Sequence, residues 1–294
     1  MRFFAAVVFA SSFLMATFSH AASPSEISVD LKLDASDFII GERVRAVLDI
    51  ANFSPDVVGI GGKVRVWAGE GENRVLKASY NVNDRVFIEV YRTSDQTQLK
   101  KISKGEFVAS FAVETGEGQK LEVFLADHYA LDVANRYMAK PVLVHGGVRY
   151  EGLPRVFDIV EGVQVGGAMQ MFSSRRGMQR EFSLVYWPRS RGEHLFLRAR
   201  DTNPSKMWRT TDLGSVLRTT KPEVSVCKDG KVFVLHRHDQ DSFVRSEFWS
   251  LPNDLEFRGR SLVLDPVTAG TQSVRELYKD SSVKPKENPW WKFW

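Results

Sequence analysis

Hydrophobic and polar residues alternate along most of the chain, which is the pattern of half-buried β-strands. Apolar residues occupy every second position from Ile27 to Leu33, and again from Val44 to Ile50. The segment Asp37–Glu42 indicates a turn between these strands, and Asn52–Asp56 indicates the next turn. Further strands are predicted at 63–67, 86–91, 107–113, 120–125, 141–144 and 155–160. Short strands separated by polar turns predict a β-sandwich.

The alternation starts again after Glu161-Gly162. It predicts strands at 163–171, 181–187, 194–200, 224–227, 231–236, 242–249 and 255–264. Asp229-Gly230, placed between two alternating runs, is a strong hairpin signal. We therefore expect an all-β protein in which a sandwich is followed by a second, smaller antiparallel β domain. A capping-box pattern at Ser273–Glu276 then predicts a short helix before the C-terminal tail.

The first residues have the pattern of a secretory signal peptide. Arg2 precedes an apolar run, and Ser19-His20-Ala21 supplies the small residues needed for cleavage near Ala21. We expect export to the periplasm, the cell surface or the exterior, with no transmembrane helix in the mature chain. The predicted division is a signal peptide at 1–21, a sandwich at 22–162, a second β domain at 163–267 and a helix, linker and tail at 268–294.

Composition and charge narrow the choice of partners. An apolar content of 43% excludes a wholly disordered chain. Residues 22–162 hold 17 Lys and Arg against 21 Asp and Glu, whereas residues 163–294 hold 22 against 15. In an exported protein, a basic half favours an envelope protein, an anionic polymer or a membrane surface over nucleic acid. The alternative is that these basic residues are scattered over a solvated surface.

The stretch Leu31–Asn52 places Gly41-Glu42 between two strands and Asn52 at the end of the second. In this it resembles bacterial Ig-like β-sandwich domains of exported proteins, and Asn135-Arg136-Tyr137 with the strands after it resembles their last hairpin. The resemblance covers about residues 26–160 and implies a sandwich, but it implies no particular activity. In the second half, Pro222–Leu235 resembles paired strands of a β-propeller blade, although the region is too short to close a propeller.

The second half contains a candidate ligand-binding face. Arg198 and Arg200 share one side of a predicted strand, and arginine suits bidentate recognition of carboxylate, sulfate or phosphate. Tyr186, Trp187 and Trp208 lie nearby in sequence and offer stacking surfaces for a sugar ring. The alternative is that the aromatic residues belong to the core and the arginines pair with carboxylates.

His236, His238 and Asp241 form the densest group of potential metal ligands, because imidazole and carboxylate suit zinc or copper. The alternative for this stretch is a polar hairpin tip. The single cysteine, Cys227, continues a strand pattern and is expected to be buried. No nucleophile elbow, zinc-protease motif or phosphate-binding glycine loop occurs, so we predict no cofactor.

The C-terminal residues Trp290-Trp291-Lys292-Phe293-Trp294 are strongly aromatic. Aromatic rings clustered in this way are usually shielded from water. Three sites could bind them: a groove of the protein itself, a groove of a partner, or the headgroup layer of a membrane. Taken together, the sequence predicts an exported, non-catalytic binding or scaffolding protein of the cell envelope. The alternative is a carbohydrate-active enzyme or other hydrolase acting on an extracellular polymer, with catalytic residues that the sequence does not identify.

Overall fold

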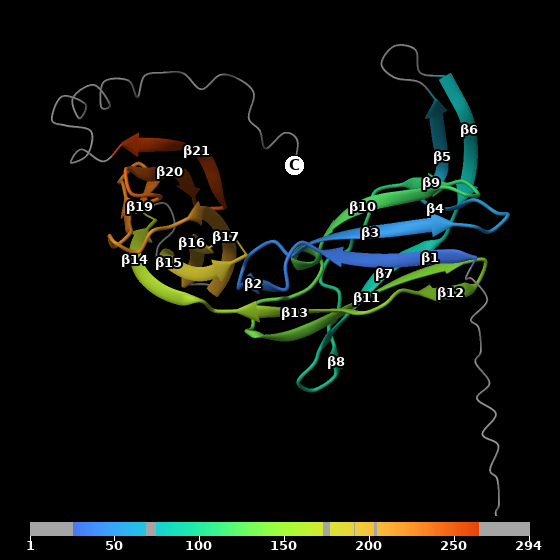
Figure 1. Cartoon of the computed structure of the whole chain (residues 1–294), viewed down its shortest axis with the longest axis horizontal. Helices are drawn as coiled ribbons and strands as arrows, with labels where there is room; N and C mark the ends of the chain where they lie inside the picture. Colours follow the sequence, from blue (N-terminus) through green and yellow to red (C-terminus); the bar gives the residue numbers. More distant parts are fainter. Residues whose placement is uncertain (1–25, 69–74, 173–176, 191, 203–204, 265–294) are drawn as a thin grey trace, which may run out of the picture.

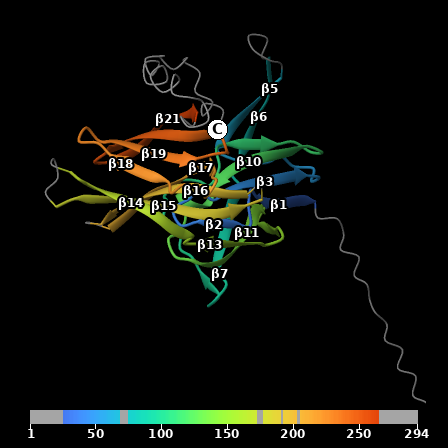
Figure 2. The same ribbon diagram turned by 60° about the vertical axis from the view of Figure 1, so that its left-hand side comes forward.

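The computed structural model describes residues 26–68, 75–172, 177–190, 192–202 and 205–264 (Figure 1). Strands dominate this part of the chain and form two sandwich-like bodies, which confirms the all-β prediction. Figure 2 shows the same two bodies from a second direction. The predicted signal peptide, the helix after Ser273 and the aromatic tail lie outside the described residues. Within the described ranges, no helix has the length and apolar character needed to cross a membrane.

Among the described residues, the first body has thirteen strands and one 3-10 helix. They are β1 (Ile27–Leu33), β2 (Asp37–Ile39), β3 (Arg45–Asn52), β4 (Val58–Ile60), β5 (Gly62–Ala68), β6 (Val75–Val82), β7 (Arg85–Arg92), β8 (Thr97–Gln98), β9 (Phe111–Val113), β10 (Gly118–Phe124), η2 (Leu125–Asp127), β11 (Asn135–His145), β12 (Val148–Glu151) and β13 (Arg155–Val160). One sheet has the order β1-β3-β10 and the other β2-β13-β11-β7-β8, with β12 beside β11. β5 and β6 form a two-stranded ribbon that projects from the sandwich (Figure 1).

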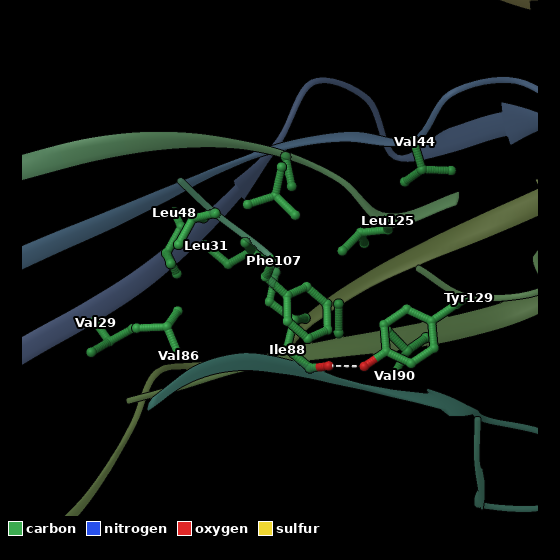
Figure 3. Close-up of a cluster of buried hydrophobic side chains, with 14 of the residues drawn as sticks. Val29, Leu31, Val44, Leu48, Val86, Ile88, Val90, Phe107, Leu125 and Tyr129 are labelled. Atoms are coloured by element: carbon green, nitrogen blue, oxygen red, sulfur yellow. Dashed lines mark hydrogen bonds between the residues drawn. The ribbon is translucent and has the colours of Figure 1, made fainter. Parts of the chain in front are cut away.

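The core of the first sandwich lies between these two sheets. Leu31 and Leu48 from one sheet and Ile88 from the other are fully buried, because alternate residues of each strand point inward (Figure 3). Tyr129, in the segment after η2, packs into the same core and donates a hydrogen bond to the Ile88 carbonyl. Burial raises the pKa of the Tyr129 hydroxyl to about 12, so it remains a donor at any physiological pH.

Asn52, at the end of β3, is buried and fully bonded. Its Nδ2 donates to the carbonyls of Asp56 (2.8 Å) and Val113 (3.0 Å), and its Oδ1 accepts from the backbone and hydroxyl of Ser54. These bonds fix the turn that follows the strand. Tyr137 on β11 donates its hydroxyl proton to the Val133 carbonyl, which is the geometry of a tyrosine corner.

In the part of the second body that the structure describes, there are eight strands. They are β14 (Val163–Met171), β15 (Gln179–Arg189), β16 (Gly192–Thr202), β17 (Ser205–Ser215), β18 (Glu223–Val226), β19 (Lys231–Arg237), β20 (Ser242–Leu251) and β21 (Asp254–Leu264). Two four-stranded antiparallel sheets, β14-β15-β16-β17 and β18-β19-β20-β21, enclose a core that includes Phe182, Leu197, Val234 and Phe248.

A buried arginine, Arg180, joins the two sheets of this second sandwich. The Arg180 side chain is fully buried, and its Nε donates to Asp201 Oδ1 at 2.8 Å. Its Nη1 donates to Ser250 Oγ and to the carbonyls of Leu251 and Asp254, at 2.9 to 3.0 Å. Arg180 therefore links β15 and β16 to the β20–β21 hairpin. This arginine belongs to the core, and its burial was not predicted from the sequence.

Several local predictions are corrected by the structure. Asp37–Ile39, expected within a turn, is strand β2 and pairs in parallel with β13, so the turn is confined to the residues around Gly41. β17 was not predicted. Cys227, expected to be buried, lies exposed just after β18 at the hairpin turn with Asp229-Gly230.

Candidate functional site at the junction of the two sandwiches

A small apolar core joins the two sandwiches. Ile39 from β2 packs against Val185 of β15 and Phe196 of β16, and all three side chains are buried. Gly162, between β13 and β14, has φ = +70°, and a Cβ there would lie 2.4 Å from Val185 Cγ1. Only glycine permits this backbone conformation together with so close an approach of the two bodies. Figure 1 shows β2 at the side of the first sandwich that faces β15–β17.

Charged groups surround this small core. Arg189 of β15 donates from Nη2 to Glu42 Oε2 at 2.5 Å and lies 3.3 Å from Asp37 Oδ2, and Trp187 Nε1 donates to the same Asp37 carboxylate. Glu42 also accepts a hydrogen bond from the Ile39 backbone at 2.8 Å. Burial raises the pKa of Glu42 above its usual value, and the attraction of Arg189 opposes that rise only in part.

Direct hydrogen bonds to the backbone complete the junction. The Thr210 backbone on β17 donates to the Gly41 carbonyl at 2.8 Å, and its hydroxyl donates to the Ile40 carbonyl at 2.5 Å. Arg198 of β16 donates to the Glu161 carbonyl. With an apolar core, a charged shell and backbone bonds, the junction holds the two sandwiches in a fixed relation.

A cleft of about 620 Å³ lies beside this junction. From the first sandwich it is lined by the β2–β3 turn, by Ile102 and by residues of the segment from Ala126 to Asp132. From the second it is lined by Ser205, Lys206, Arg209, Asp254 and Leu255. A cleft of this size between two domains is a common location for a binding site.

The charged residues of the cleft include both signs. They are the bases Arg43, Lys206 and Arg209 and the acids Glu42, Asp127, Asp132 and Asp254. Arg43 pairs with Asp127 at 2.7 Å, and Glu42 is held by Arg189. Two of the four carboxylates are therefore engaged with arginine, and the other two are those of Asp132 and Asp254.

A serine and a histidine lie next to residues that line the cleft. Ser103 Oγ and His128 Nδ1 are 2.6 Å apart, and the Phe107 ring packs on the imidazole with centroids 4.4 Å apart. Burial, with the nearby Lys101 charge, lowers the pKa of His128 below its usual value. The imidazole is thus neutral near pH 7, and a neutral ring is able to accept a proton from a hydroxyl.

The arginine and aromatic residues that were predicted to form one ligand-binding face do not lie together in the structure. Arg198 and Arg200 do lie on one face of β16, where Arg198 is partly covered by the first sandwich and Arg200 is exposed and bonded to Ser205. Trp187 is part of the junction, whereas Tyr186 points to the opposite side, into the core of the second sandwich. The backbone of residue 208 belongs to β17, and the Trp208 side chain lies outside what the structure describes.

The three residues of the predicted metal site also lie apart. His236 is buried in the core of the second sandwich, while His238 and Asp241 are exposed at the β19–β20 turn. Among the described residues, no three His, Cys, Asp or Glu side chains gather in a way that holds a metal ion. The tail residues 290–294 lie outside the described ranges.

Sequence reasoning missed the junction, although a signal for it was present. Residues 182–186 of β15 are buried without interruption, because one face meets the core and the other meets the first sandwich. Within β15, Leu184-Val185-Tyr186-Trp187 is an apolar run, which is typical of a strand covered on both faces. The similar run Leu195-Phe196-Leu197 on β16 has the same cause.

Comparison with known proteins adds little to this geometry. No protein-family model matches the sequence, and no curated protein matches it. Among solved structures, the chain is similar to the crystal structure of Spo0M, a sporulation control protein from Bacillus subtilis, at 10% identity. The match covers 87% of this chain and 97% of that chain with a TM-score of 0.24. A TM-score this low carries no argument about fold or function.

Proposed function

We propose that this protein is an exported, non-catalytic binding or scaffolding protein of the cell envelope, and that the cleft between its two sandwiches is the contact site. The observation that supports this proposal is the cleft itself, which is lined by acidic and basic side chains from both bodies. The binding target is an anionic polymer, a membrane surface or a protein partner.

The junction supports the proposal because it makes the cleft a preformed site. The hydrogen bonds of Thr210 and Arg189 to the β2–β3 turn hold one wall of the cleft against the other. A preformed site loses little conformational entropy on binding, which favours affinity. Binding at such a site requires no chemical step.

The test is site-specific photocrosslinking in producing cells. A photoreactive amino acid replaces Ile102, which is 62% exposed on one wall of the cleft, or Ser205 on the other wall. The matched control position is Val148 on β12, which is 54% exposed and does not line the cleft. Cells are then fractionated, with a parallel chain lacking Trp290–Trp294 to separate tail-dependent association with membranes from cleft-dependent binding.

We expect cleavage near Ala21, recovery in the exported fraction, and one discrete adduct from positions 102 and 205 but not from 148. The chain without its last five residues should form the same adduct if the cleft is the site. Retention of an uncleaved chain inside the cell contradicts export. The same adducts from all three positions, or none from the cleft, contradict a binding role for the cleft.

The hydrolase alternative has one observation in its favour, the hydrogen bond between Ser103 and His128 beside the cleft. A hydroxyl bonded to a neutral imidazole is the arrangement that activates a serine nucleophile. A fluorophosphonate probe tests it directly. The hydrolase is supported if the purified protein is labelled, if Ser103→Ala abolishes labelling and if Ser205→Ala does not. An unlabelled wild-type protein excludes this form of the alternative.

A further inference from the structure

We infer that the cleft binds a peptide segment of mixed charge, with an acidic group placed on Arg209 and a basic group on Asp132. This inference rests on the proposed function and names its ligand class. The two residues belong to different bodies: Arg209 lies on β17, and Asp132 lies in the segment between η2 and β11. A ligand that contacts both therefore spans the cleft.

Arg209 and Asp132 are available for such contacts. Both side chains are exposed, and neither has a hydrogen bond or ion pair with any residue that the structure describes. Arg43, by contrast, is already paired with Asp127 at 2.7 Å. The groups left for a ligand thus include one cation on the second sandwich and one anion on the first.

Between these charges the cleft has an apolar surface. Leu131 and Leu255 line it from opposite bodies and are mostly buried, whereas Ile102 is exposed. An apolar surface flanked by opposite charges complements a short run of apolar residues between an acid and a base.

The other ligand classes fit less well. A polyanion or an anionic headgroup would meet Asp132 and Asp254 as well as the bases, and like charges across an interface are unfavourable. A glycan needs open aromatic faces for stacking, whereas the aromatic residue among the described lining residues, Tyr129, is buried. A peptide supplies both signs of charge and the apolar run in one chain.

The inference is tested by selecting phage-displayed random heptapeptides on the full mature protein and measuring synthetic copies by fluorescence anisotropy. We expect enriched sequences in which an acid and a base flank apolar residues. Arg209→Glu should weaken their binding about tenfold, the effect of turning one charge-assisted contact into a repulsion. Replacing the acid of the peptide by lysine should restore binding to Arg209→Glu, and the reciprocal exchange should hold for Asp132→Lys.

The control is Arg85→Glu, an equally drastic change at an exposed arginine of β7 that does not line the cleft. The inference is overturned if no peptide sequence is enriched, or if Arg85→Glu weakens peptide binding as much as Arg209→Glu does. It is also overturned if uncharged peptides bind equally well. It is also overturned if peptides bind only when Trp290–Trp294 are removed, since the tail is then the occupant. If peptides fail while crosslinks at positions 102 and 205 identify a polymer or lipid, the proposed function stands and the peptide inference falls. If crosslinks fail as well, both fall.

Discussion

His236 makes the stability of the second sandwich depend on pH. His236 is 1% exposed on β19, and neither ring nitrogen makes a hydrogen bond of normal geometry with a residue that the structure describes. Burial, with repulsion from Arg260 and His238, lowers its pKa from 6.5 to about 4, although the Ser215 carbonyl and Asp212 act in the opposite direction. Protonation of this ring is therefore much harder in the folded protein than in the unfolded chain.

The size of the effect follows from the two pKa values. Because the folded pKa is the lower one, the unfolded chain binds more protons, and stability falls as the pH drops below 6.5. The loss reaches about 2 kcal/mol at pH 5 and levels off near 3 kcal/mol below pH 4. Above pH 7 the histidine contributes no pH dependence.

The assay is chemical denaturation of the wild type and of His236→Leu, followed by tryptophan fluorescence at several pH values between 7.5 and 5. Leucine removes the titrating group and two unbonded buried nitrogens, so its stability at pH 7.5 should equal or exceed that of the wild type. The stability difference between the two proteins should then change by about 2 kcal/mol in favour of leucine by pH 5. Other groups that titrate, including Glu42, are common to both proteins and cancel.

The control is His238→Gln, because His238 lies exposed two residues along the chain. It should retain most of the acid sensitivity of the wild type. Parallel pH profiles for the wild type and His236→Leu would show that the buried imidazole is not the source of acid sensitivity. The reasoning from its burial would then be refuted.

Three further changes test the packing. Arg180→Met leaves Asp201 buried without the guanidinium and should cost about 3–5 kcal/mol in denaturant titrations, and a loss below about 1 kcal/mol would contradict the role of the buried pair. Gly162→Ala should lower the melting temperature more than Gly147→Ala, because both have positive φ but only the first meets a neighbouring side chain, at 2.4 Å. Equal shifts would show that the junction is not closely packed there. Asn52→Ala should cost about 1–3 kcal/mol, since it removes the two hydrogen bonds that Nδ2 donates to backbone carbonyls and the two that Oδ1 accepts from Ser54. An unchanged urea midpoint would argue against that network.

Local signals were sufficient for much of the fold. The alternation from Ile27 to Leu33 coincides with β1, and Asp229-Gly230 does form the turn before β19. These features depend on neighbouring residues only, since a strand needs a period of two and a tight turn needs glycine. Asn52 was identified from its place after a strand, and its buried hydrogen bonds explain why an amide is suited to that position.

Contacts between distant residues were beyond local signals. β2 exists because Asp37–Ile39 pairs with β13, more than a hundred residues later in the chain, as the register Phe38 to Ile159 shows. Arg180 is buried because Ser250 and Asp254 lie about 70 residues away in sequence and beside it in space. The residues near either segment do not identify these partners, so Asp37–Ile39 was expected within a turn and the burial of Arg180 was not predicted.

The cleft was missed for the same reason. Arg209 and Asp132 have unremarkable sequence neighbours, and their relation depends on how one sandwich docks on the other. Docking depends in turn on Ile39, Val185 and Phe196. The sequence placed Ile39 in a turn of the first domain and the other two residues in strands of the second. The alternation of apolar and polar residues therefore predicts strands, but it does not predict a site that is formed by two domains together.

The shared apolar core has a consequence for how this protein can be divided. Glu161-Gly162 is a clear boundary in the sequence, yet a chain cut there exposes Val185 and Phe196 on one fragment and Ile39 on the other. Each fragment would expose a new hydrophobic patch. The two halves are therefore poor candidates for exchange between proteins as independent modules. Gene fusion or domain shuffling at this point would have to preserve the pairing, and the two sandwiches are expected to be inherited together.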